Sequence, residues 1–189
     1  MVEVPCLTGY ETLKFPEPLG ILEAAVTSGG LSTMPIELEG EVRNLENKTL
    51  RYLGHWERFK GYSELGLFEE TPILIDGKEI IPRNVYHTLL EPKITIDQIK
   101  DLGIIKIFAN GLKDEKEINT VIELIDYYDD ITGFSAMQRL TGWHASVMSI
   151  LEVQNKVKKG AVSVNNAISG DLMINELRKR GLNIKIEEK

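Results

Sequence analysis

Hydrophobic residues come in short alternating runs along the first part of the chain and at helical spacing towards its end. The apolar run Ile21–Val26 leads into Gly29-Gly30, which predicts a strand that ends in a tight turn. Apolar and polar residues alternate through Glu41–Leu53, which predicts two strands joined by a turn at Glu46-Asn47. The aromatic residues of His55–Leu65 then take helical spacing, so we expect a helix there.

Turn-forming residues separate the next elements. Asp76-Gly77 lies between two β-rich runs and predicts a hairpin, because both residues tolerate positive φ. Pro82 is expected to begin a helix that stops before Pro92. Ile104–Ala109 and Glu117–Tyr128 are expected to pair as a long antiparallel ribbon with a turn at Asn110-Gly111.

The helical pattern dominates after residue 130. Phe134–Lys156 predicts one long helix, with Gly160 as the residue that follows its C-terminal turn. A second helix is expected over Gly170–Arg180, and a strand over Leu182–Ile186. Strands followed by helices predict an α+β (mixed α/β) fold, with a mainly antiparallel or mixed sheet covered by helices. We expect a first domain at residues 1–130 and a C-terminal group of helices and a strand at residues 131–189.

Composition excludes several classes of function. The chain of 189 residues has a net charge of −7, which argues against a nucleic-acid-binding or anionic-membrane surface. It contains no apolar run long enough for a membrane span, and its single cysteine, Cys6, rules out an internal disulfide and a multi-cysteine zinc site. The carboxylates and histidines show no metal-binding spacing. We expect a cytoplasmic protein without a metal.

Two segments carry candidate binding chemistry. Thr27-Ser28-Gly29-Gly30 has two interpretations: a simple turn at the end of a strand, or a loop lining a ligand pocket, because glycines let a backbone approach a ligand closely and Ser28, Ser32 and Thr33 offer hydroxyls. The segment Lys48–His55 also has two interpretations. It is either a solvated strand face followed by a helix, or a grip for a carboxylate, in which Thr49 and Arg51 share one strand face and His55 supplies a proton acceptor or donor.

A third candidate lies in the long helix, at Thr141-Gly142-Trp143-His144. A glycine in mid-helix costs about 1 kcal/mol relative to alanine, so Gly142 indicates close approach of another helix or sheet, or of a ligand. Packing is the interpretation that we favour slightly. We assign no function to His87, and we expect Asp126, Asp129 and Asp130 to cap a helix.

The two segments resemble the substrate-side domain of the saccharopine dehydrogenase-like family, whose hallmark is T-S-G-G-L-S-T-L-P followed by K-T-L-R-Y-P-G-H. Thr27–Pro35 and Lys48–His55 match it, with Met34 and Leu53 as departures. The Gly54-His55 ending is closest to the lysine 6-dehydrogenase branch. Thr141-Gly142 resembles the T-T-G of a helix that returns to the nucleotide-binding domain, although the residues after Gly142 depart from the family pattern.

The resemblance implies an NAD- or NADP-dependent oxidoreductase that acts on the C–N bond of an amino acid. It implies that Arg51 holds the substrate carboxylate with help from Thr49 and Ser28. It also implies that His55 orients or deprotonates the amine, and that Thr141 and Gly142 flank the cofactor. The loop residues Gly29, Gly30 and Thr33 complete the expected substrate site. A homodimer formed through the ribbon Ile104–Tyr128 is implied as well.

The chain contains no Gly-x-Gly, the sequence typical of a dinucleotide-binding turn. We therefore expect a fragment or a split gene product that needs a separate nucleotide-binding domain, binds NAD or NADP weakly, and does not turn over substrate alone. The alternative is a non-catalytic ligand-binding or dimerisation module that kept the fold. An unrelated α+β scaffold is a third possibility, which a large separation between Gly29-Gly30 and the pair Arg51 and His55 would support.

Overall fold

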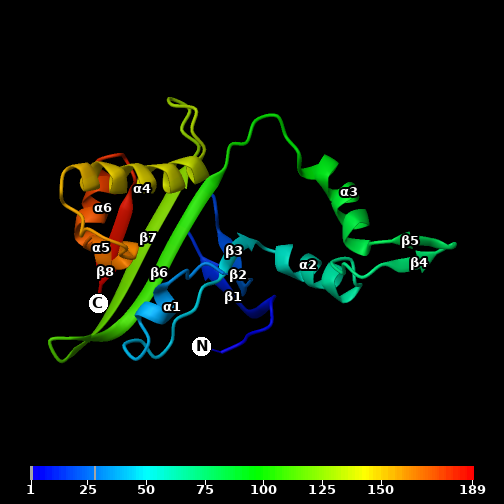
Figure 1. Ribbon diagram of the computed structural model, residues 1–189, viewed down its shortest axis with the longest axis horizontal. Coiled ribbons are helices and arrows are strands. Elements are labelled where there is room, and N and C mark those ends of the chain that lie inside the picture. Colours follow the sequence, from blue (N-terminus) through cyan, green and yellow to red (C-terminus); the bar gives the residue numbers. More distant parts are fainter. Residues whose placement is uncertain (1, 28) are drawn as a thin grey trace. The chain divides into compact units, whose positions relative to one another are not determined.

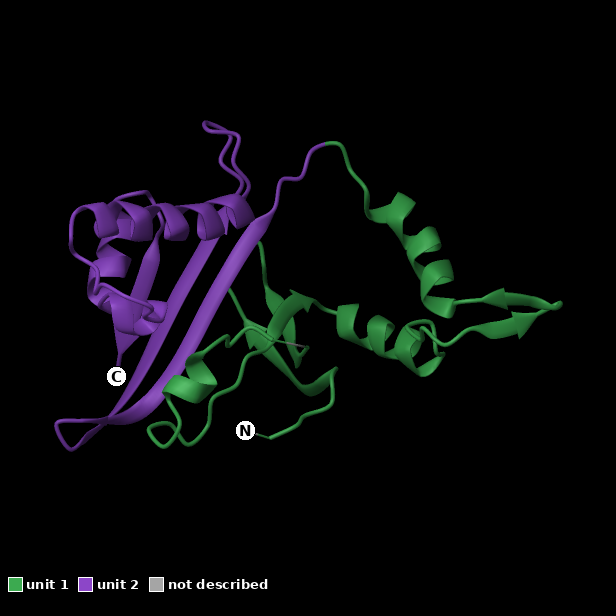
Figure 2. Ribbon diagram, viewed as in Figure 1, with its two compact units in different colours: residues 1–97 green, residues 98–189 purple. Residues whose placement is uncertain are grey.

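The computed structural model describes residues 2–27 and 29–189, and the chain divides into two compact units, residues 1–97 (unit 1) and 98–189 (unit 2). Figure 2 colours the two units separately. Each unit has its own three-stranded antiparallel sheet with helices, so the mixed α+β fold predicted from sequence is confirmed. The boundary expected at residue 130 falls inside unit 2, in the loop that precedes its first helix.

Unit 1 is built on a sheet in the order β1-β2-β3, with β2 in the centre (Figure 1). Buried apolar side chains from β2 and its surroundings form its core, namely Phe15, Leu19, Leu22, Ala24, Ala25 and Trp56. The elements of this part are β1 (Thr8–Lys14), β2 (Ile21–Val26), α1 (Met34–Glu37), β3 (Thr49–Tyr52) and α2 (His55–Glu64). The predicted strand at Ile21–Val26 and the predicted helix after Gly54 are confirmed.

A hairpin and a helix follow in unit 1: β4 (Ile73–Ile75), β5 (Lys78–Ile80) and α3 (Pro82–Ile94). The turn lies at Asp76-Gly77, with φ of 50° and 76°, as the sequence predicted. Aromatic rings join α2 to α3: the ring centroids of Phe68 and Tyr86 are 4.9 Å apart, and those of Phe59 and Phe68 are 6.0 Å apart. Edge and tilted contacts of this kind are favourable for aromatic pairs.

Unit 2 has a sheet in the order β6-β7-β8, in which the long strands β6 and β7 pair along their whole length (Figure 1). Helices pack on one face of it, around a buried cluster of Leu124, Leu182 and Ile184 together with Ile122, Leu140, Trp143, Ile174 and Leu177. Its elements are β6 (Leu102–Lys113), β7 (Lys116–Tyr127), α4 (Ala136–Val153), α5 (Val164–Ala167), α6 (Gly170–Arg178) and β8 (Ile184–Glu188).

The N-terminus of α4 has an acceptor for each of its first backbone N–H groups. Ser135 Oγ accepts from the N–H of Gln138 at 3.1 Å, and Gln138 Oε1 accepts from the N–H of Ser135 at 2.8 Å, which is a capping box. The Asp101 carboxylate accepts from the N–H groups of Ala136 and Met137 at 2.7 and 3.0 Å. The start of α4 is therefore fixed both by its own sequence and by the segment preceding β6.

Several predicted boundaries in unit 1 are wrong. Glu41–Leu53 forms one strand, β3, instead of two, because the N–H groups of Glu41 and Val42 bond to the Leu38 carbonyl in turns that follow α1. The helix α3 continues through Pro92 to Ile94. Pro92 lies in the last turn of α3, where its ring removes only one backbone hydrogen bond.

In unit 2 the turn of the ribbon and the helix end were misplaced. Asn110-Gly111 lies within β6, and the turn is made by Asp114 and Glu115 with φ of 52° and 64°. The longer pairing keeps the alternating apolar residues of β7 in register with β6. The left-handed residue after α4 is Asn155 (φ 55°), not Gly160, because the helix already ends at Val153. The last strand runs from Ile184 instead of Leu182.

Within the described part of the chain, no helix combines the length and apolar character that crossing a bilayer requires.

Candidate functional site

The paired strands β2 and β3 place two of the predicted binding residues on one face. Glu23 lies opposite Arg51 and Ala25 opposite Thr49 in the antiparallel register, so Thr49 and Arg51 share a face, as their spacing predicted. The hydroxyls of Thr27 and Thr49 are joined by a hydrogen bond of 2.7 Å. This bond ties the end of β2 to the start of β3, where the glycine loop begins.

The glycine loop returns to β3 at Asn47. Gly30 has a φ of 92°, a backbone conformation that favours glycine, and a Cβ on it would lie 2.7 Å from Oδ1 of Asn47, an exposed side chain that can move aside. Gly29 also has positive φ but faces open space. Thr33 directly precedes α1 and makes no side-chain capping bond. The predicted contribution of Ser28 lies outside the described residues.

Arg51 and His55 both contact the Trp56 ring. The guanidinium carbon of Arg51 is 5.7 Å from the centroid of that ring, and the imidazole of His55 meets it edge-on at 4.7 Å. The Arg51 side chain donates to the Leu50 carbonyl at 2.7 Å, and no carboxylate of the described residues lies within ion-pairing distance of it. An exposed guanidinium on an aromatic ring keeps its donors available for a carboxylate from outside the chain.

His55 begins α2 and stacks on Phe59, with ring centroids 4.3 Å apart and an angle of 18° between the rings. Burial lowers the pKa of His55 below its ordinary value of 6.5, the positive charges of Arg51 and Arg58 lower it further, and Glu23 opposes this by raising it. The imidazole is therefore neutral at pH 7. A neutral imidazole can accept a proton from an ammonium group.

Glu23 is a central residue of this site that the sequence interpretation missed. It is 1% exposed, and its carboxylate accepts from Tyr10 Oη at 2.6 Å and from the N–H groups of Gly54 and Trp56 at 3.0 and 2.6 Å. Burial raises the pKa of Glu23, but these hydrogen bonds together lower it more, so the pKa lies below 4.5. A single charged residue inside the apolar run Ile21–Val26 is the signal that could have identified it.

The remaining predicted residues lie in unit 2 or on α3. Thr141 and Gly142 lie on α4 and are exposed, and a Cβ on Gly142 would meet no atom of the described residues within 4 Å. The close approach expected at Gly142 is therefore not made within this structure. His144 also lies on α4, half-buried. His87 is exposed on α3, with its ring centroid 5.4 Å from that of Tyr86.

The predicted capping acids form a different arrangement from the one expected. Arg139 Nε lies 3.0 Å from the buried carboxylate of Asp126, and Arg139 Nη1 lies 3.2 Å from Asp129. Burial raises the pKa of Asp126, while the charge of Arg139 acts in the opposite direction. These groups tie α4 to the end of β7, and Asp101 performs the capping that the sequence assigned to Asp126 and its neighbours.

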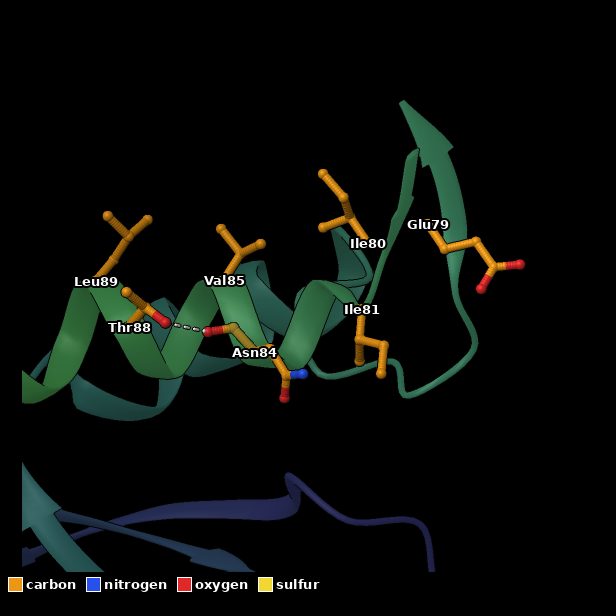
Figure 3. Close-up of a pocket in the computed structure, with 7 residues that line it drawn as sticks. All are labelled: Glu79, Ile80, Ile81, Asn84, Val85, Thr88 and Leu89. Atoms are coloured by element: carbon orange, nitrogen blue, oxygen red, sulfur yellow. Dashed lines mark hydrogen bonds between the residues drawn. The ribbon is translucent and has the colours of Figure 1, made fainter. Parts of the chain in front are cut away.

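Two surface hollows lie away from these residues. One, of about 380 Å³, lies in unit 1 along α3 and β5, where Ile80, Val85 and Leu89 point to the same side (Figure 3). The other, of about 420 Å³, lies in unit 2 beside the end of α4 and is lined by residues such as Met148 and Lys158. Neither hollow includes Thr49, Arg51 or His55.

The described residues do not fit a dinucleotide. The strands pair only in antiparallel fashion, whereas a dinucleotide fold needs a glycine-rich turn between a parallel strand and a helix. At the junction from β3 through Gly54 to α2, the backbone N–H groups that would face a pyrophosphate are already bound to the Glu23 carboxylate. Among the described residues, no group of three or more His, Cys, Asp or Glu side chains is arranged to hold a metal ion.

The fold and the junction of β2, β3 and α2 define an α+β domain in which a buried carboxylate supports an exposed arginine and a neutral histidine. The family profile described as the saccharopine dehydrogenase C-terminal domain matches residues 4–182. The chain therefore belongs to this family, as the sequence resemblance predicted, and it corresponds to the substrate-side domain of these dehydrogenases. The family implies NAD or NADP as cofactor. Because the chain belongs to this family, the third possibility, an unrelated α+β scaffold, is excluded.

Proposed function

We propose that this chain is the substrate-side domain of an NAD(P)-dependent oxidoreductase that acts on a C–N bond of an amino acid, within the lysine dehydrogenase branch. The observation that carries the proposal is the Arg51 guanidinium, which lies over Trp56 beside a neutral His55 and has no carboxylate partner among the described residues. A free amino acid offers the two groups that such a pair can recognise, a carboxylate and an ammonium.

The geometry supports the following roles. Arg51 binds the carboxylate of the substrate, and Thr49 assists from the same strand face. His55 accepts a hydrogen bond or a proton from the amine, since its pKa is held below 6.5. The loop carrying Gly29, Gly30 and Thr33 begins at the Thr27–Thr49 hydrogen bond, beside Thr49, and would contribute to the substrate site from there.

The cofactor belongs to a separate nucleotide-binding domain in this proposal. Thr141 and Gly142, exposed on α4, would contact that domain and the cofactor it holds. Open space at Gly142 favours this assignment, because the approach of another backbone requires it. The chain alone binds the amino acid and does not turn it over.

Calorimetric titration of L-lysine and saccharopine into the purified chain tests the proposal. We expect weak binding that is lost in Arg51→Ala and retained in Arg83→Ala, a matched control because Arg83 is exposed on α3 and is not among the charged groups that act on His55. Titration with NAD or NADP should give no tight binding. Tight nucleotide binding, or amino-acid binding that is indifferent to Arg51, would refute the assignment. Activity on addition of the nucleotide-binding domain would exclude a non-catalytic module.

We also propose that the chain forms a homodimer through the face of the β6–β7 ribbon opposite α4. That face carries Phe108 and Tyr127, whose exposed fractions are 54% and 48%, and exposed aromatic residues are typical of interfaces. Analytical ultracentrifugation should show a dimer that Phe108→Glu converts to a monomer. Leu89→Glu, at an apolar position on α3 that is 63% exposed, is the control and should stay dimeric.

A further inference from the structure

Glu23 lies where a charge is costly and is held by donors from two other elements. It lies in the central strand β2, between the buried side chains of Leu22 and Ala24. Tyr10, on β1, donates its hydroxyl to Oε2 at 2.6 Å. The chain entering α2 donates two backbone N–H groups, from Gly54 to Oε2 and from Trp56 to Oε1. A buried carboxylate is tolerated when its oxygens are satisfied in this way.

The same hydrogen bonds fix the residues of the proposed substrate site. Gly54 has a φ of 83°, so the chain reverses between β3 and α2 at the residue that Glu23 holds. His55 lies between Gly54 and Trp56, both bound to Glu23. The Trp56 indole N–H also donates to the Glu23 carbonyl at 3.3 Å, so the residue under Arg51 is held through both its backbone and its ring.

The carboxylate also fills a position that would compete with Arg51 for an anion. The first N–H groups of a helix attract carboxylates and phosphates. In α2 these donors are directed at Glu23, whose pKa below 4.5 keeps it ionised at neutral pH. An incoming carboxylate is therefore repelled from the start of α2 and is left with the guanidinium of Arg51.

We propose that Glu23, assisted by Tyr10, is the positioning residue of this site: it holds Trp56 as the platform for Arg51, orients His55, and directs the substrate carboxylate to Arg51. The ligand part of this inference rests on the proposed amino-acid function. The positioning of His55 does not, because it is a property of the chain without ligand.

The titration of His55 separates positioning from simple stabilisation. The charged groups that act on His55 come from three elements: Glu23 on β2, Arg51 on β3 and Arg58 on α2. The negative charge of Glu23 raises the pKa of His55, whereas the two arginines lower it. Removing that charge while keeping the shape of the side chain should therefore lower the pKa of His55 further.

The experiment compares three variants of the full chain with the parent: Glu23→Gln, Tyr10→Phe and Glu57→Gln. Glu57 is an exposed carboxylate on α2 and serves as the charge-matched control. NMR titration of the imidazoles, with His55 assigned from His55→Gln, should show a lower pKa of His55 in Glu23→Gln than in the parent. In Glu57→Gln the pKa of His55 should equal that in the parent. Calorimetry should show L-lysine binding weakened roughly tenfold or more in Glu23→Gln.

Tyr10→Phe keeps the inference testable if Glu23→Gln fails to fold. It removes one donor at a position that is 56% exposed, and we expect it to weaken L-lysine binding relative to the parent; an unchanged affinity in folded Tyr10→Phe would overturn the assisting role of Tyr10. A folded Glu23→Gln with unchanged His55 titration and unchanged lysine affinity would overturn the positioning role. If the parent binds no lysine while Glu23→Gln still lowers the pKa of His55, the proposed function fails and the positioning of His55 stands.

Discussion

Removing the Asp101 carboxylate tests how the long helix α4 is anchored in unit 2. In the structure Asp101 is the only acceptor described for the N–H groups of Ala136 and Met137, at 2.7 and 3.0 Å, whereas the capping box of Ser135 and Gln138 serves the other two donors. Asp101→Ala therefore removes half of the acceptors at this helix terminus and leaves the capping box intact.

The expected loss follows from the exposure of the two donors. Ala136 is 0% exposed, so water cannot replace its partner, and a lost hydrogen bond to a charged group there costs about 1.5–3 kcal/mol. Met137 is 64% exposed, so water replaces its partner at a cost of about 0.5 kcal/mol. Losing the attraction between the carboxylate and the helix dipole adds about 0.5 kcal/mol. The free energy of unfolding should fall by about 2.5–4 kcal/mol in Asp101→Ala, and by about 1 kcal/mol in Asp101→Asn, which keeps one acceptor.

Urea unfolding followed by tryptophan fluorescence measures this loss. The chain has two tryptophans, Trp56 in unit 1 and Trp143 in unit 2. In a Trp56→Phe background, Trp143 on α4 alone reports the unfolding of unit 2. The midpoint should fall by roughly 2 M in Asp101→Ala. Equal effects of Asp101→Ala and Asp101→Asn, or a loss below about 1 kcal/mol in Asp101→Ala, would refute the argument that the buried N–H depends on this carboxylate.

Three further outcomes are expected. Gly29→Ala and Gly30→Ala should each destabilise unit 1 by about 1–2 kcal/mol in urea unfolding, since both positions have a positive φ and the exposed Asn47 side chain beside Gly30 can move aside; no measurable loss would contradict the strain. The free energy of unfolding of unit 1 should fall as the pH drops below 4.5, because Glu23 takes up a proton more readily in the unfolded chain than in the folded one. In Glu23→Gln this free energy should fall less steeply with pH over the same range. Leu182→Ala should cost about 3 kcal/mol by calorimetry, since this side chain is 2% exposed in the core of unit 2, and a cost below about 1 kcal/mol would mean that the cavity collapses.

Local pattern was enough to predict most elements of the fold. The Asp76-Gly77 hairpin, the apolar strand Ile21–Val26 and the long helix in unit 2 each carry their own signal, and all are present. The errors arose where two local signals competed. Asn110-Gly111 is a strong turn signal, but the pairing of β6 with β7 overrides it, and the turn falls at Asp114 and Glu115.

The candidate site was predictable only in part, for a similar reason. Periodicity places Thr49 and Arg51 on one face of a strand, and the register confirms that arrangement. The support from Glu23 depends on a partner on another strand and on the start of a helix, and neither is visible in the spacing along the chain. The functional roles of Arg51 and His55 remain predictions for the binding experiments.

The hydrogen bond between Thr27 and Thr49 has a consequence for how this domain diversifies. It closes the base of the glycine loop, so the strands on either side do not depend on the loop for their pairing. Evolution, or an engineer, can exchange the segment from Gly29 to Asn47 as one cassette, while Lys48, whose Nζ lies 2.8 Å from the Glu11 carboxylate on β1, stays with the sheet. Under the proposed function, new substrate preferences would then be acquired by loop replacement, while Arg51 and His55 stay on a constant frame.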